Sequence, residues 1–154
     1  MDFKGKLASE LKLLEHELRV ELPKEIKKAL AMGDLRENAE YHAALERQSF
    51  VKARIGQLKN RLAEISSINK DEIARDRIGL GSIAKVMDID ADKEVVYEFV
   101  LPEEADPANG KISLSSPLGR GFTGRVEGDE VTIQVPSGRR TYEVLSIQTI
   151  HDRG

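Results

Sequence analysis

Two acidic side chains at a short spacing are the main candidates for chemistry in this sequence. They lie in the run GDLRENAEYHAA, residues 33–44, where Asp34 and Glu37 stand three positions apart. Residues at this spacing share one face of a helical turn. In local terms Gly33 would end one helix, Asp34 would cap the next, and Glu37 would complete a capping box. Local chemistry therefore predicts a structural role for both carboxylates.

Other reactive residue types offer less. Cysteine is absent, which excludes disulfides, thiolate metal sites and cysteine nucleophiles. The three histidines, His16, His42 and His151, are too widely spaced to suggest a zinc site. A GxGxxG spacing at residues 119–124 lacks the preceding strand and following helix that a dinucleotide site needs. We therefore expect neither zinc nor a bound nucleotide.

Composition limits the class of protein. The chain has 154 residues, of which 40% are apolar and 33% charged, so it can bury a core under a charged surface. Its net charge of −3 argues against a general nucleic-acid coat or a membrane-surface protein. Since no signal-like apolar run opens the sequence and no long apolar run follows, we expect a soluble cytoplasmic protein without a membrane partner.

The elements that must carry the acidic pair are two helical stripes. Apolar residues recur at steps of three and four from Phe3 to Leu30, with a change of phase near Pro23, where we expect a kink or a helix restart. A second stripe, from Tyr41 to Ile65, forms a regular heptad seam.

Two such stripes, joined by a few residues, can bury themselves only against each other. We therefore predict an antiparallel α-helical coiled-coil hairpin over residues 1–76, with an acidic tip at about residues 33–41. A hairpin this thin cannot hold a pocket, so its tip and its sides are the candidate working surfaces.

Basic residues border the second seam on both sides. They are Arg47, Arg54 and Arg61 at heptad position g, and Lys52 and Lys59 at position e. One interpretation pairs them with acids of the first helix, such as Glu10, Glu17, Glu21 and Glu25, as e and g charges commonly pair. The other makes them a positive track for a phosphate backbone that leads to the tip. Both readings can hold for different residues.

From Gly79 onward the pattern changes to short β-type runs bounded by turn signals. One stretch, residues 117–124, can hold a short helix. We predict a small antiparallel β-sheet domain with one helix over residues 77–154, and thus an α+β protein of two domains. The expected strands are residues 83–86, 95–101, 112–114, 131–135 and 141–150.

The run at residues 33–44 closely resembles the tip motif of the Gre family of bacterial transcript cleavage factors, in particular its GreA type. The segment SSPLGRGFTGR, residues 115–125, also resembles a characteristic stretch of that family's C-terminal domain. The resemblance covers the whole chain. It implies a coiled-coil hairpin followed by an FKBP-like domain, in agreement with the periodicities.

The resemblance also implies a function. Such factors insert their coiled coil into the secondary channel of RNA polymerase and stimulate the polymerase's own cleavage of backtracked RNA, while the C-terminal domain docks at the channel entrance. Carried onto this sequence, Asp34 would coordinate the second Mg²⁺ and Glu37 would orient the attacking water, with Asn38 and Tyr41 as support. The Mg²⁺ would be shared with the polymerase and would not bind stably to the free chain, which is expected to be a monomer and not an enzyme by itself.

One departure from the family concerns contact with the nascent RNA 3′ end. Many relatives carry an arginine where this chain has Leu45, so the candidate RNA contacts here are Arg47, Lys52 and Arg54. A weak track of this kind predicts short backtracks and short released fragments.

Three alternatives stay open at the level of sequence. A Gre-related inhibitor would occupy the polymerase channel without promoting cleavage. The C-terminal domain could instead be a peptidyl-prolyl isomerase or chaperone, although so few aromatic residues make a proline pocket doubtful. A plain coiled-coil adaptor is the third possibility.

Overall fold

The structure, a computed structural model, describes residues 3–33 and 38–153. Its chain divides into two compact units, Met1–Ile68 and Asn69–Gly154, each with its own buried cluster. Asp34 and Glu37 lie outside the described residues. Within the described part of the chain, no helix is both long enough and apolar enough to cross a membrane.

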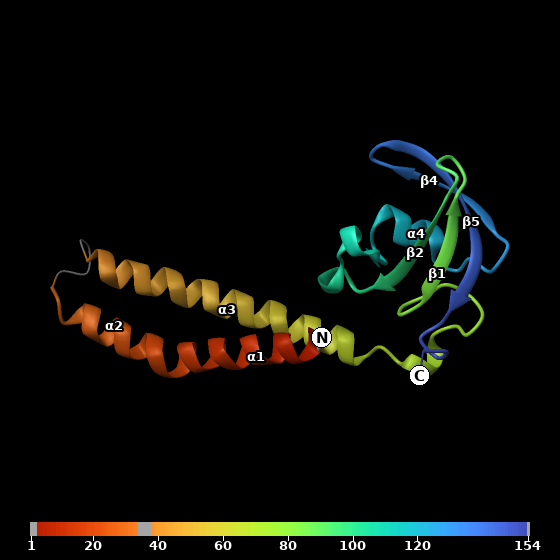
Figure 1. The fold of residues 1–154 in the computed structure, drawn as a ribbon. Coiled ribbons are helices and arrows are strands. Elements are labelled where there is room, and N and C mark those ends of the chain that lie inside the picture. Colours follow the sequence, from red (N-terminus) through yellow and green to blue (C-terminus); the bar gives the residue numbers. More distant parts are fainter. Residues whose placement is uncertain (1–2, 34–37, 154) are drawn as a thin grey trace. The chain divides into compact units, whose positions relative to one another are not determined.

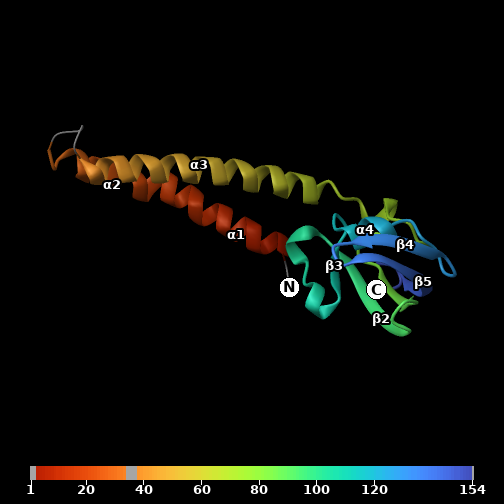
Figure 2. The ribbon, with the colours of Figure 1, turned by 90° about the horizontal axis from the view of Figure 1, so that it is seen from above.

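The first unit is the predicted helical hairpin. One arm contains α1 (Phe3–His16), the π-helical segment η1 (Glu17–Glu21) and α2 (Leu22–Leu30). The other arm is a single helix of 28 residues, α3 (Ala39–Ser66). Figures 1 and 2 show the two arms side by side along most of their length, which confirms the hairpin.

The phase change near Pro23 is realised as the π-helical segment η1, and the chain stays helical through it. Pro23 has no backbone N–H to donate to the carbonyl of Arg19, and its ring would clash with that carbonyl in a regular α-helix. A wider π turn relieves the clash. It also keeps Leu18 and Leu22, four residues apart, directed toward the same partner helix.

The buried seam of the hairpin is narrow, and its central residues are shielded from solvent. Leu22 and Val51 are fully buried and Ile55 nearly so. The leucines packed against them are Leu11, Leu14 and Leu18. At the tip end the predicted stripe is wrong by one position, because Ala29 is buried whereas Leu30 is 44% exposed. Ala29 follows Leu22 by seven residues, close to two helical turns, so it returns to the same face.

The second unit is built on a five-stranded sheet with the order β3-β2-β1-β5-β4. A 3₁₀ turn, η2 (Lys70–Glu72), precedes the sheet. Two more, η3 (Pro102–Glu104) and η4 (Pro107–Asn109), lie between β2 and β3. The strands are β1 (Ile83–Asp88), β2 (Lys93–Val100), β3 (Lys111–Ser113), β4 (Glu130–Val135) and β5 (Gly138–Gln148).

The predicted sheet domain with one short helix is confirmed, and one strand pairing differs from the expected antiparallel pattern. β3 runs parallel to β2, with Ile112 opposite Phe99, so the sheet is mixed. The crossover through η3 and η4 brings the chain back only to the level of Glu98, opposite which Lys111 begins β3, and a parallel pair requires such a crossover.

The core of this unit is aromatic at its centre. The short helix α4 (Pro117–Phe122) packs on β3 and β4 (Figure 1). Its last residue, Phe122, is fully buried in one cluster with residues of the sheet. Rings of Tyr97, Phe99, Phe122 and Tyr142 contact one another at centroid distances of 5.3 to 6.5 Å. The aromatic residues of the second unit are therefore used for packing.

Candidate functional site

The described flanks of the tip are the end of α2 and the start of α3. Gly33 has a φ of 130°, a backbone conformation that other residues rarely adopt. Glycine at this position, just beyond the first arm, agrees with the predicted helix stop. The two carboxylates for which a catalytic role was predicted, Asp34 and Glu37, fall between these flanks and outside the described residues.

Asn38 caps α3. Its side-chain oxygen Oδ1 accepts a hydrogen bond from the backbone N–H of Tyr41 at 3.0 Å. The sequence offered the capping role to Asp34, and that prediction is wrong for this helix because α3 begins at Ala39. A cap at Asp34 looked plausible because Asp and Asn cap helices about equally well.

The same Asn38 side chain also reaches the other arm. Its Nδ2 donates to the carbonyl oxygen of Ala29, near the last turn of α2, at 2.5 Å. One amide therefore bonds to both helices.

Tyr41, the other predicted supporting residue, is half-buried at the start of the seam. Its ring lies edge-on to His42, with centroids 5.8 Å apart.

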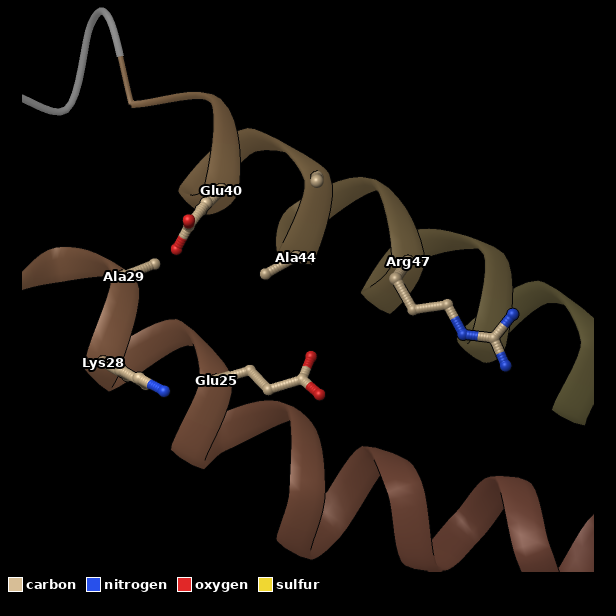
Figure 3. A pocket seen from close by; sticks show the side chains of 7 residues that line it. Glu25, Lys28, Ala29, Glu40, Ala44 and Arg47 are labelled. Carbon is tan, nitrogen blue, oxygen red and sulfur yellow. The ribbon is translucent and has the colours of Figure 1, made fainter. Parts of the chain in front are cut away.

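Just behind the tip the two arms come close together. The methyl groups of Ala29 and Ala44 point toward each other between the helices, and both residues are buried (Figure 3). A groove of about 360 Å³ runs beside them, with Glu25, Lys28, Glu40 and Arg47 around it. Two acids and two bases leave this groove without net charge, so it selects neither anions nor cations.

Arg47, the first candidate RNA contact, is held within the hairpin. Its guanidinium makes a two-pronged pair with Glu17, with Nε–Oε2 at 2.6 Å and Nη2–Oε1 at 2.8 Å. It also lies over the ring of Phe50, 5.2 Å from the centroid. The hydrogen bonds from Arg47 lower the pKa of the Glu17 carboxyl below its ordinary value.

Arg54 repeats the arrangement one heptad further along α3. It pairs with Glu10 through two hydrogen bonds, of 2.9 and 3.0 Å, which lower the pKa of the Glu10 carboxyl. For Arg47 and Arg54 the reading that paired them with acids of the first helix is therefore confirmed. Lys52 differs: it is exposed and makes no ion pair with any residue that the structure describes.

Sequence reasoning missed two residues of this region, Ala29 and Phe50. Ala29, the carbonyl partner of Asn38, was missed because the larger Leu30 beside it continues the apolar stripe in the sequence. Phe50 was passed over, although an aromatic residue at an outward heptad position is visible in the sequence, and it is 57% exposed. The signal that could have found it is Arg47, three residues earlier on the same helical face.

The described residues contain no cluster of three histidine, aspartate or glutamate side chains able to hold a metal ion. Carboxylate oxygens are the ligands that Mg²⁺ prefers, so Asp34 and Glu37 suit it chemically. Two carboxylates supply only part of the octahedral shell that Mg²⁺ requires.

Comparison with known proteins covers both units. A family model described as "Transcription elongation factor, GreA/GreB, C-term" matches residues 73–149. A second, "Transcription elongation factor, N-terminal", with the model name GreA_GreB_N, matches residues 4–66.

Individual relatives agree along nearly the full length. Transcription elongation factor GreA of Clostridium kluyveri is 47% identical over 150 residues, covering 96% of this chain and 94% of that protein. Its namesake from Clostridium perfringens is 46% identical, with coverages of 96% and 95%. Among solved structures, the crystal structure of GreA factor homolog 1 of Thermus thermophilus is 26% identical, covers 94% of each chain and has a TM-score of 0.44.

Proposed function

The chain belongs to the GreA/GreB family of transcription elongation factors, and from this premise we propose that it stimulates transcript cleavage by RNA polymerase. In this proposal the hairpin enters the secondary channel of a backtracked polymerase and brings Asp34 and Glu37 to its active centre. The polymerase performs the hydrolysis, and this chain acts as its cofactor.

The observation that carries the proposal is the place of the acidic run in the hairpin. Residues 34–37 connect the two arms, so the chain can present both carboxylates at the far end of a narrow support. The 28 residues of α3 would span about 42 Å at 1.5 Å per residue. A two-helix probe of this length can reach a centre that lies deep within a larger protein.

Each tip residue has a distinct proposed task. Asp34 offers a carboxylate oxygen to the weakly held second Mg²⁺ of the polymerase, and Glu37 accepts a hydrogen bond from the attacking water and orients it. When bound, a metal pair of this kind activates water and stabilises the leaving oxygen. Because Asn38 caps α3, the chain does not need Asp34 for capping that helix.

Contact with the extruded RNA would begin at Lys52. Its ammonium is exposed and pairs with no carboxylate in the described part of the chain, so it can meet a phosphate at no cost in broken ion pairs. Arg47 and Arg54 would have to exchange Glu17 and Glu10 for phosphate oxygens. This supports the expectation of a weak RNA track and of short released fragments.

The direct test is a transcript-cleavage assay on stalled, backtracked polymerase complexes, with and without Mg²⁺. We expect the wild-type chain to accelerate cleavage, and Asp34→Asn and Glu37→Gln to abolish the acceleration while thermal unfolding stays unchanged. Asparagine and glutamine keep the shape and hydrogen-bonding reach of the originals but lose the charge that a metal ion requires.

Two outcomes would contradict the proposal. Variants that still drive cleavage at the wild-type rate would show that the carboxylates do no chemistry. A wild-type chain that binds the polymerase and blocks synthesis without cleavage would be the Gre-related inhibitor instead.

Isomerase activity is not expected. The second unit has an apolar groove of about 300 Å³, but its lining residues, such as Pro107, Leu118 and Val135, include no aromatic side chain.

A further inference from the structure

The side chain of Asn38 makes two hydrogen bonds, one more than capping a helix requires. Oδ1 accepts from the N–H of Tyr41 in the first turn of α3, and Nδ2 donates to the carbonyl of Ala29 in the last turn of α2. The first and last turns of helices leave N–H and C=O groups without partners. One side-chain amide thus satisfies an orphan donor of one helix and an end carbonyl of the other.

The partners fix the orientation of this amide. The N–H of Tyr41 can only donate, so it must face Oδ1, and the carbonyl of Ala29 can only accept, so it must face Nδ2. The Ala29 carbonyl also accepts from the N–H of Met32 at 3.1 Å, which uses its second lone pair. The two printed partners of the Asn38 side chain therefore agree with a single orientation of its amide.

Close packing of the arms makes the double contact possible. Ala29 and Ala44 are 3% and 7% exposed and face each other behind the tip (Figure 3). Because the side chain of alanine is only a methyl group, the two helices can approach each other closely at these positions. The end of α2 is then within reach of a side chain as short as asparagine.

Residue type separates capping from bridging at position 38. Serine, aspartate and asparagine all cap helices well. Aspartate cannot donate when ionised, and the hydroxyl of serine stands on a shorter side chain. Among the good caps, asparagine combines the acceptor that α3 needs with a donor able to reach Ala29.

We infer that Asn38 is a positioning residue, an amide clasp that joins α2 to α3 and fixes both ends of the segment that carries the acidic pair. In the sequence, Glu37 comes directly before Asn38. This inference rests on the proposed function, because it assigns to Asn38 the task of holding Asp34 and Glu37 where the polymerase's metal can use them. Asn38 itself touches neither metal nor RNA.

The test is Asn38→Ser in the full-length protein, assayed for cleavage over a range of factor and Mg²⁺ concentrations. Since small misplacements of reacting groups can cost large factors in rate, we expect the maximal cleavage rate to fall about tenfold or more. The factor concentration at half-saturation should change by less than about twofold, because the loss affects the reacting geometry rather than binding. Higher Mg²⁺ should restore part of the rate.

A matched control exists in the other unit. Asn69 caps η2 by accepting from the N–H of Asp71 at 3.0 Å, the same bond length as at Asn38. Asn69→Ser makes the same chemical change at a cap without a clasp and should leave cleavage unchanged. Equal losses in the two variants, a wild-type rate in Asn38→Ser, or a shift in half-saturation alone would each overturn the inference.

The clasp can also be tested without cleavage. In the free protein, the Nδ2 protons of Asn38 should exchange with solvent at least about tenfold more slowly than those of the exposed Asn60, because one of them is held by Ala29. Equal exchange rates would show that the clasp does not form. Asp34→Asn belongs in the same assays: if it cleaves normally the proposed function fails, whereas the exchange result still decides whether the clasp exists.

Discussion

At the scale of single residues, donor and acceptor geometry decides which charges of the hairpin are available. Arg47 and Arg54 present planar forks that match the carboxylates of Glu17 and Glu10, and both are engaged twice. Lys52 carries a compact ammonium and pairs with no described residue. Equal formal charges on one helix therefore differ in what they can offer to an RNA phosphate.

Tyr142 provides a residue-scale prediction. Burial, followed by the neighbouring Tyr97, raises its pKa to about 12. An unfolded tyrosine ionises near pH 10, so the folding stability linked to Tyr142 is fully present below about pH 10 and is lost as the pH rises toward the folded value. We expect an alkaline absorbance titration of tyrosinate to show a late component that disappears in Tyr142→Phe. If the late component survives the substitution, it belongs to another tyrosine.

At the scale of elements, the arms of the hairpin are held in register by apolar and ionic contacts together. Leu22, Val51 and Ile55 form the buried seam. The two arginine–glutamate pairs lie beside it with the same seven-residue spacing on both helices. A slip of one arm would therefore break the ion pairs and the seam at once.

This pairing makes the hairpin sensitive to acid. The pKa values of Glu10 and Glu17 are lowered from 4.5 in the folded chain, so their stabilisation is present above pH 4.5 and is lost as the pH falls through the folded values. Exposed ion pairs contribute modestly to stability. The melting temperature of the hairpin, followed by helical circular dichroism, should therefore fall by a few degrees below pH 4.5. Glu17→Gln should show a smaller loss, and an equal loss would exclude the pair as its cause.

Periodicity predicted the two stripes because burial on one face of a helix repeats along the sequence. It misplaced the end of the first stripe, since the π turn before Pro23 and the small size of Ala29 are not visible in a pattern of large apolar residues. The partner of Asn38 was also missed, and so was the parallel pairing of β3 with β2, although β3 itself was predicted as a strand. Each depends on residues distant in sequence, whose approach is set by packing. The roles of Asp34 and Glu37 stay predictions.

At the scale of the whole molecule, each of the two units has its own buried cluster. The hairpin buries a few residues along one seam, whereas the second unit buries ten residues in one cluster around Phe99 and Phe122. The segment after α3 belongs to the second unit: a ring nitrogen of His151 lies 2.8 Å from the carbonyl of Ile73, and Ile78 is buried. Separate cores of unequal size need not unfold together.

Two unfolding transitions are therefore expected in urea. In a Tyr41→Phe variant the remaining tyrosines, Tyr97 and Tyr142, report only on the second unit, and the helical circular dichroism signal reports mainly on the hairpin. Since two-state behaviour requires coincident transitions by different probes, separate cores should give distinct curves, with the helical signal lost at lower urea because its seam buries less apolar surface. Tyr41→Phe keeps the backbone N–H that Asn38 caps, so the hairpin itself should be little affected. Curves that coincide in midpoint and slope would show that the two units unfold as one cooperative body.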